Sequence, residues 1–234
     1  AGDPRNGIDL HQAEPSLLGR EMAAGRVDLA LLPAFAVLSN AGLKAADGIS
    51  IGSDGPVRSV LLYARRPLGK IRTLASDPAS LSSNALARVL LAERHGVRPT
   101  PARADEADAV VIIGDAAFKP LPGPWQEVVD LGEAWRALIG LPFVYALWAG
   151  PTLDARTAGI LREAARLGLE DRPRIAADAA KDGRLGIHKT EALTYLTQHI
   201  RYELGERQRK GLDAFAGMLR VHGLLKEAHG PAWI

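Results

Sequence analysis

Two short apolar runs, at residues 110–113 and 144–148, constrain the fold of this chain more than any other feature of its sequence. The first run ends in Gly114-Asp115, and the second follows a Gly-Leu-Pro turn. Apolar runs of this length between turn residues are typical of buried strands. A glycine and a carboxylate directly after a buried strand lie at a sheet edge, where α/β proteins bind ligands.

Strand and helix patterns continue along the whole chain. Strands are expected at residues 27–32, 49–51, 57–64, 73–75, 110–113, 128–131 and 144–148. Helices are expected at residues 15–24, 34–45, 80–95, 133–138, 154–168, 172–181, 189–203 and 206–226. The alternation of strands with helices predicts parallel α/β lobes, and the helix-only C-terminal region is expected to pack onto one of them.

The 234 residues, 47% of them hydrophobic, are enough for one large lobe or two smaller ones with a sizeable core. The expected strands at 57–64 and 144–148 are natural crossings between two lobes. They predict a smaller lobe at 66–143 and a larger, discontinuous lobe formed by residues 1–65 and 144–234.

The charge pattern argues against nucleic-acid and membrane partners. The net charge is only +2, from 29 basic and 27 acidic residues, and the arginines form no stripe with aromatic residues. No apolar run approaches the roughly 20 residues that span a bilayer. The opening AGDPRNG is polar and turn-like rather than a signal peptide, which favours a cytoplasmic location.

The sequence offers no metal or cofactor motif. It contains no cysteine, so disulfides, thiolate metal sites and cysteine nucleophiles are excluded. The six histidines are dispersed, and no H-E-x-x-H, Walker or dinucleotide-binding pattern is present. We therefore expect a protein that works without a metal or another cofactor, on a small-molecule ligand.

Two serines mark the start of the helix expected at residues 80–95. The first backbone N–H groups of a helix are unpaired and attract anions, and the hydroxyls of Ser82 and Ser83 would add donors for a carboxylate or phosphate. The alternative is plain capping of the helix by Ser80 or Ser82.

Three further residues are candidates for ligand binding. Ser59 lies in an expected strand, where it either donates to a ligand carboxylate or bonds to a neighbouring strand. Its neighbour Arg58 would point to the opposite face as a surface charge. Gly114 allows a ligand to approach the backbone, and Asp115 either binds a substrate hydroxyl or caps a helix.

Four segments in order carry a resemblance to a known family. Residues 25–33 read GRVDLALLP, residues 55–62 read GPVRSVLL, residues 80–86 read SLSSNAL, and the stretch 110–148 follows. Together they resemble the chorismate dehydratases of the futalosine route to menaquinone, over most of the chain. The third segment departs from the family pattern at Ser82, where threonine is usual.

The resemblance implies a fold and an activity. The implied fold is a two-lobed, periplasmic-binding-protein-like (type II) α/β structure with a ligand cleft between the lobes and a helical C-terminus. The implied activity is a hydro-lyase reaction that removes water from chorismate, a dianion, to give 3-[(1-carboxyvinyl)oxy]benzoate. The implied substrate-binding residues are Ser59, Ser82, Ser83, Gly114 and Asp115, and the catalytic proton acceptor is not identifiable.

Because one fold hosts several functions, two other interpretations stay open. The main alternative is a non-catalytic solute-binding protein for a small organic anion. The other is the later enzyme of the same route, which releases dihydroxynaphthoate from a cyclic precursor.

The family also begins with a strand and a loop of the type x-x-Y-x-N-x-x-P, whose asparagine is expected to contact the substrate. Neither Asn6 nor Asn40 stands in that context. Losing a central strand would leave backbone groups of both neighbouring strands unpaired. We therefore expect that such a strand precedes residue 1 in the natural protein.

Overall fold

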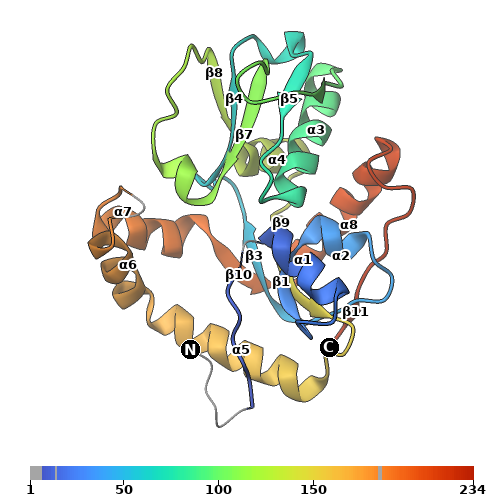
Figure 1. The fold of residues 1–234 in the computed structure, drawn as a ribbon, viewed down its shortest axis with the longest axis vertical. Helices are drawn as coiled ribbons and strands as arrows, with labels where there is room; N and C mark the ends of the chain where they lie inside the picture. The colour runs from blue at the N-terminus through green and yellow to red at the C-terminus, as the bar shows by residue number, and fades with distance from the viewer. Residues whose placement is uncertain (1–6, 14, 184–185) are drawn as a thin grey trace.

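Two β-sheets organise the chain, one in each of the two lobes seen at the top and the bottom of Figure 1. The computed structural model describes residues 7–13, 15–183 and 186–234. Asn6 lies outside these residues. Asn40 is part of a turn, where its side-chain oxygen accepts the N–H of Gly42 at 2.9 Å.

The larger lobe takes its strands from both halves of the chain. They are β1 (Ala30–Pro33), β2 (Lys44–Ala45), β3 (Gly48–Ser53), β9 (Phe143–Gly150), β10 (Arg201–Leu204) and β11 (Ala232–Trp233). Their order is β10-β3-β9-β2-β11, and β1 also pairs with β9. The helical elements of this lobe are α1 (Pro15–Ala23), α2 (Ala34–Leu38), α5 (Ala155–Glu170), α6 (Arg172–Lys181), α7 (Lys189–Thr194), the π-helical turn η4 (Tyr195–His199) and α8 (Glu206–Val221).

The smaller lobe is one continuous stretch of chain. Its strands are β4 (Val60–Ala64), β5 (Thr73–Ala75), β6 (Thr100–Pro101), β7 (Ala109–Ile113) and β8 (Glu127–Asp130), in the order β6-β5-β7-β4-β8. Its helical elements are the short η2 (Leu68–Lys70), α3 (Leu81–His95), the 3₁₀ turn η3 (Gly114–Phe118) and α4 (Leu131–Ile139).

The expectation of parallel sheets is wrong for most strand pairs. Strand β9 is antiparallel to β1, β2 and β3, and β4 is antiparallel to β7 and β8. Parallel pairing is confined to β5 with β6 and β7, and to β11 with β2. The reason is the path of the chain: β3 leads out to the smaller lobe and β9 returns beside it, so the two run in opposite directions.

The C-terminal region is not purely helical. The helix expected at 189–203 ends at His199, and residues 201–204 form β10 against β3. These four residues alternate between exposed and less exposed, which is the pattern of an edge strand. A second late strand, β11, pairs with β2.

Helix α3 agrees closely with the helix expected at residues 80–95. The hydroxyl of Ser80 caps its N-terminus by accepting the N–H of Ser83 at 3.2 Å. Gly96 ends it with a left-handed φ of 67°, a conformation that glycine adopts without strain. Leu86 and Val89 on this helix are fully buried, so α3 forms part of the core.

Strand pairing also locates the point where the chain enters the smaller lobe. Strand β4 belongs to the smaller sheet, with Leu62 opposite Val111 on β7 and both side chains buried. The chain therefore belongs to the smaller sheet from Val60 on. On the return path, β9 of the larger sheet begins at Phe143. The lobe boundaries at 65/66 and 143/144 stay predictions of the sequence.

The carboxylate of Asp130 anchors the outgoing crossing. It accepts the backbone N–H of Val57 at 3.0 Å and that of Arg58 at 2.7 Å. It also caps α4 by accepting the N–H groups of Gly132 at 2.9 Å and Glu133 at 3.1 Å. Arg58 has a left-handed φ of 63°, which is strained for a residue with a Cβ. One side chain therefore fixes both the crossing segment and the helix beside it.

An aromatic cluster anchors the returning crossing. Trp135 on α4, Phe143 on β9 and Phe215 on α8 are all buried, and their ring centroids lie 4.8–6.0 Å apart in edge-to-face contacts. Gly211 on α8 packs directly on the crossing, because an added Cβ would lie 2.0 Å from the Pro142 carbonyl oxygen.

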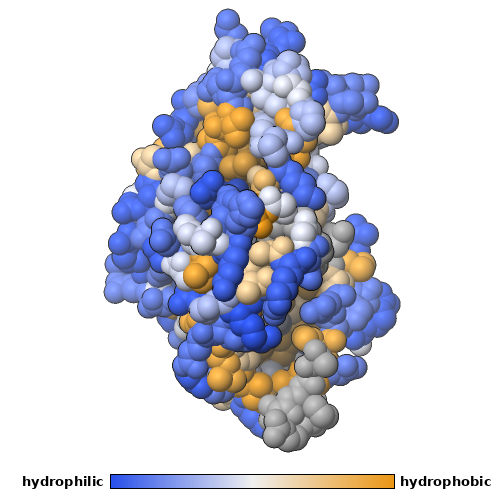
Figure 2. Space-filling model, turned by 90° about the vertical axis from the view of Figure 1, so that its left-hand side faces the viewer, coloured by the Kyte–Doolittle hydropathy of each residue, from blue (hydrophilic) through white to orange (hydrophobic). Residues whose placement is uncertain are grey.

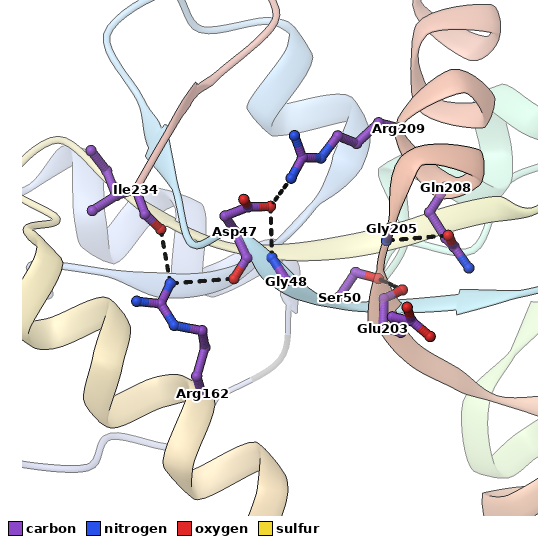
Figure 3. A network of polar contacts seen from close by, with 9 residues as sticks. All are labelled: Asp47, Gly48, Ser50, Arg162, Glu203, Gly205, Gln208, Arg209 and Ile234. Atoms are coloured by element: carbon purple, nitrogen blue, oxygen red, sulfur yellow. Dashed lines mark hydrogen bonds and ion pairs between the residues drawn. The ribbon is translucent and has the colours of Figure 1, made fainter.

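A polar network ties the far edge of the larger sheet to its helices (Figure 3). The side chain of Asp47 accepts the N–H of Gly48 at 2.7 Å and forms an ion pair with Arg209 of α8. Arg162 of α5 donates to the carbonyl oxygen of Ile234 at 3.1 Å. These contacts hold the last strand, β11, against the rest of the lobe.

On the face shown in Figure 2, hydrophilic side chains cover most of the area and hydrophobic residues form separate patches. Within the described part of the chain, no helix is both long and apolar enough to cross a bilayer.

Replacing Asp130 with alanine should destabilise the fold strongly, because four backbone N–H groups lose their acceptor. We expect a loss of about 3 kcal/mol of unfolding free energy, measured by urea denaturation. The control is Asp154→Ala on exposed α5, where one cap bond to the N–H of Thr157 is lost and about 1 kcal/mol is expected. Equal losses for the two variants would contradict the anchoring role of Asp130.

Replacing Gly132 with alanine should also destabilise the crossing. Its new Cβ would lie 2.6 Å from the Gly55 carbonyl oxygen and 2.7 Å from Ser53 Oγ, so the crossing strand must move. We expect a loss of about 2 kcal/mol. Gly159→Ala in α5, where a Cβ meets no atom within 4 Å, should instead stabilise the protein by about 1 kcal/mol. Thermal unfolding of both variants provides the measurement.

Candidate ligand site between the lobes

The candidate site lies at the edge of the smaller sheet that faces the larger lobe. Because β5 and β7 are parallel, their carboxyl ends meet at this edge. The antiparallel β4 begins there, with Val60 opposite Ile113. The carboxyl edge of parallel strands is where open α/β sheets bind ligands.

Ser59 and Gly114 are direct neighbours at this edge. The backbone N–H of Gly114 donates to the carbonyl oxygen of Ser59 at 2.8 Å. Gly114 has a left-handed φ of 63°, and an added Cβ would meet nothing within 4 Å, so its backbone borders open space. Asp115 follows it and is exposed. The structure therefore brings three of the five expected site residues together.

The side chain of Ser59 contacts the larger lobe. Only 4% of Ser59 is exposed, and its Oγ accepts a hydrogen bond from the hydroxyl of Tyr195 at 2.8 Å. Ser59 lies just before β4 rather than in the middle of a strand. Arg58 is exposed, as expected, and its guanidinium lies 3.8 Å from the carboxylate of Glu191 on α7.

Other contacts on the same side hold the lobes together. The rings of Phe118 on η3 and Tyr195 on η4 meet edge to face, with centroids 4.9 Å apart. Nδ1 of His199 donates to the carbonyl oxygen of Pro56 at 3.0 Å. The segment from α7 to η4 thus packs against both the crossing strand and the first turn after β7.

Ser82 and Ser83 are buried at the start of α3. The hydroxyl of Ser82 donates to the carbonyl oxygen of Tyr145 on β9 at 3.0 Å and accepts the N–H of Phe35 on α2 at 3.1 Å. Ser82 therefore links the lobes. The hydroxyl of Ser83 accepts from Ser80 at 2.8 Å, and Ser80 provides the helix cap, as the capping interpretation predicted.

Asp77 connects the two groups of site residues along the sheet edge. Its side chain accepts the N–H of Ile113 at the end of β7, at 3.3 Å. Its backbone N–H and carbonyl oxygen both bond to the side chain of Asn84 on α3, at 2.9 and 2.7 Å. The loop before α3 is therefore fixed to the strand that carries Gly114 and Asp115.

Tyr145 extends from the larger lobe toward the same region. Its hydroxyl lies 3.3 Å from Ser53 Oγ on β3. Burial raises the pKa of the Tyr145 hydroxyl well above its ordinary value, and the nearby Asp130 and Tyr195 raise it further, while the Ser53 bond acts in the opposite direction. Tyr145 therefore stays neutral at physiological pH.

Tyr195 and Tyr202 are seven residues apart in the chain but lie on different elements. Tyr195 lies in η4 and bonds to Ser59, whereas Tyr202 lies on β10. Burial raises the pKa of Tyr202 to about 12. Tyr195 was missed as a site residue because its contact joins positions that are 136 residues apart.

Polar donors dominate this edge, and Asp115 is its exposed carboxylate. Among the residues that the structure describes, no three His, Asp or Glu side chains lie close enough to hold a metal ion. The donors are serine and tyrosine hydroxyls and backbone N–H groups. Such groups bind carboxylates or other anions through hydrogen bonds.

Two cavities lie elsewhere in the molecule. A groove of about 500 Å³ is lined by Arg166, Arg172, Leu193 and other residues of α5, α6, α7 and η4. An apolar pocket of about 250 Å³ lies in the smaller lobe, beside Leu62, Leu90 and Leu131. Neither is lined by the five expected site residues. In this structure Ser59 and Ser82 bond directly to the opposite lobe.

The fold is that of the two-lobed, periplasmic-binding-protein-like class. A protein of Archaeoglobus fulgidus, AF1704, superposes with a TM-score of 0.67 at 17% identity, over 91% of this chain and 86% of that one. The periplasmic aliphatic sulphonate binding protein SsuA of Escherichia coli superposes with a TM-score of 0.53 at 16% identity, over 96% and 82% of the two chains.

The chain belongs to the menaquinone biosynthesis family, whose model matches residues 3–220. A chorismate dehydratase of Thermus thermophilus is 32% identical, over 91% of this chain and 87% of the relative. A chorismate dehydratase of Campylobacter jejuni is 27% identical, over 89% and 82%. The family resemblance inferred from the sequence motifs is confirmed.

The raised pKa of Tyr145 predicts a loss of stability in alkali. A phenol whose pKa is higher in the folded than in the unfolded protein stabilises the fold fully below about pH 10, and this contribution is lost as the pH rises further. The variant Tyr145→Phe should therefore show a smaller decline in unfolding free energy between about pH 9 and 11. Parallel declines for variant and parent, measured by urea denaturation, would contradict this origin.

Proposed function

We propose that this chain is a chorismate dehydratase, a hydro-lyase that removes water from chorismate to give 3-[(1-carboxyvinyl)oxy]benzoate. The observation that carries the proposal is the 32% identity to a chorismate dehydratase over nine-tenths of the chain. The site between the lobes supports it, because hydroxyl and backbone donors gather where a dianion would bind.

The reaction depends more on the positioning of the substrate than on a strongly acidic or basic side chain. Chorismate is a cyclohexadiene with a hydroxyl and two carboxylates, and loss of the hydroxyl with a ring proton makes the ring aromatic. The enzyme must hold both carboxylates, exclude water and favour this elimination over competing rearrangements. Neutral hydrogen-bond donors that are held in place before the substrate binds are suited to holding its carboxylates.

The proposed roles follow from the positions of the site residues. Ser59 donates to one carboxylate, and the start of α3 at Ser82 and Ser83 binds the other. Gly114 lets the substrate approach the backbone, and Asp115 orients the substrate hydroxyl by accepting a hydrogen bond from it. A carboxylate of the substrate itself accepts the ring proton and passes it to this hydroxyl, which leaves as water.

Substrate entry requires the lobes to separate. Ser82 and Ser59 now bond to Tyr145 and Tyr195 of the larger lobe, so a ligand between the lobes would exchange some of these contacts for its own. Closure around the substrate then provides a site without bulk water. The cytoplasmic location and a small-molecule partner without nucleic acid or membrane stay predictions of the sequence.

The second candidate is a solute-binding protein for a small organic anion. The likeness to SsuA favours it, because that protein has the same fold. The two functions differ in one observable: an enzyme changes chorismate, whereas a binding protein returns it intact.

Incubation with chorismate, followed by mass detection, tests the proposal. A product lighter by one water is expected, together with loss of the diene absorbance. Saturable binding without a product would contradict the enzyme and support the solute-binding alternative.

Variants of the two serines test their roles. Ser59→Ala should raise KM for chorismate about 10-fold, the effect of one lost bond to a charged group. Ser82→Ala should lower both kcat/KM and stability, because Ser82 also links the lobes. The control is Ser39→Ala, an exposed serine that bonds only within its own turn. Unchanged kinetics in both site variants would contradict the assignment.

A further inference from the structure

The Tyr195–Ser59 hydrogen bond has a direction. The hydroxyl of Tyr195 donates and Ser59 Oγ accepts, at 2.8 Å. A serine hydroxyl has one proton and two acceptor sites, so accepting from Tyr195 leaves the Ser59 proton for another acceptor. Within the described residues, no hydrogen bond uses that proton. The Ser59 hydroxyl is therefore oriented to donate its proton to a group other than Tyr195.

Tyr195 is held firmly in this role. Its ring packs edge to face against Phe118, and burial raises the pKa of its hydroxyl, which keeps it protonated and able to donate at neutral pH. It opens a π-helical turn, in which Ile200 donates its N–H to the Tyr195 carbonyl oxygen at 3.1 Å.

The bond spans the two lobes. Ser59 belongs to the smaller lobe and Tyr195 to the larger one, so Tyr195 orients Ser59 only when the lobes are together. The contact between His199 and Pro56 lies on the same side and supports this arrangement. Orientation of the serine is thus coupled to closure of the lobes.

We propose that Tyr195 is a positioning residue that fixes Ser59 as a hydrogen-bond donor to a substrate carboxylate when the lobes close. This proposal rests on the function proposed above and deepens it. It implies that this end of the site favours a strong acceptor such as a carboxylate over an ammonium group, which has no acceptor site for the Ser59 proton.

The test is a double-mutant cycle between the two residues. Tyr195→Phe keeps the ring contact with Phe118 and removes only the donor. It should raise KM for chorismate about 5-fold with a smaller change in kcat, since the Ser59 hydroxyl then rotates between donor and acceptor states. In a Ser59→Ala background, Tyr195→Phe should have no further effect on KM.

The matched control is Tyr202→Phe. Tyr202 is also partly buried, lies close by on β10 and has a raised pKa, but no hydrogen bond to Ser59. It should keep the KM of the parent protein. Thermal unfolding of every variant shows that the comparison is made on folded protein.

The outcomes separate this inference from the proposed function. If the parent protein converts chorismate but Tyr195→Phe matches it in KM, the inference is wrong and the function stands. Effects of Ser59→Ala and Tyr195→Phe that simply multiply would also overturn the inference. If the parent protein neither binds nor converts chorismate, the proposed function fails and the inference fails with it.

Discussion

The rest of the structure depends on the carboxylate of Asp130, which accepts hydrogen bonds from four backbone N–H groups. These bonds join the crossing segment at Val57 and Arg58 to the first turn of α4, and so define where one lobe ends and the other begins. Ser59 follows directly in the chain. The strained φ of Arg58 persists because Asp130 holds its N–H, and this geometry places Ser59 at the sheet edge that faces the larger lobe.

The two lobes meet through hydroxyl groups as well as through an apolar core. Ser82 bonds to β9 and to the start of α2, and Ser59 bonds to Tyr195. Hydrogen bonds between neutral groups are individually weak, so a ligand with stronger acceptors can replace some of them. Under the proposed function, the chain opens to admit an anion and closes over it with the same donors.

The sequence predicts local elements well and long-range contacts poorly. The Ser80 cap and Gly96 stop of α3, and the apolar run of β7, are local signals, and the structure confirms these elements. Asp130 before a Leu-Gly-Glu turn carries a capping signal that could have been found. Its bonds to Val57 and Arg58 carry none, because they join residues 72 or more positions apart in the chain. The contact of Tyr195 with Ser59 was not predicted for the same reason. Strand β10 was not predicted because its four residues also fit a helical period.

A crystal structure with 3-[(1-carboxyvinyl)oxy]benzoate bound would show directly whether Ser59 and the start of α3 form the ligand site. We expect one carboxylate oxygen at hydrogen-bonding distance, roughly 2.5–3.2 Å, from Ser59 Oγ, with the Tyr195 hydroxyl still donating to the same serine. Product bound away from this edge, for example in the groove between α5 and α7, with Ser59 and the start of α3 free of ligand, would contradict it.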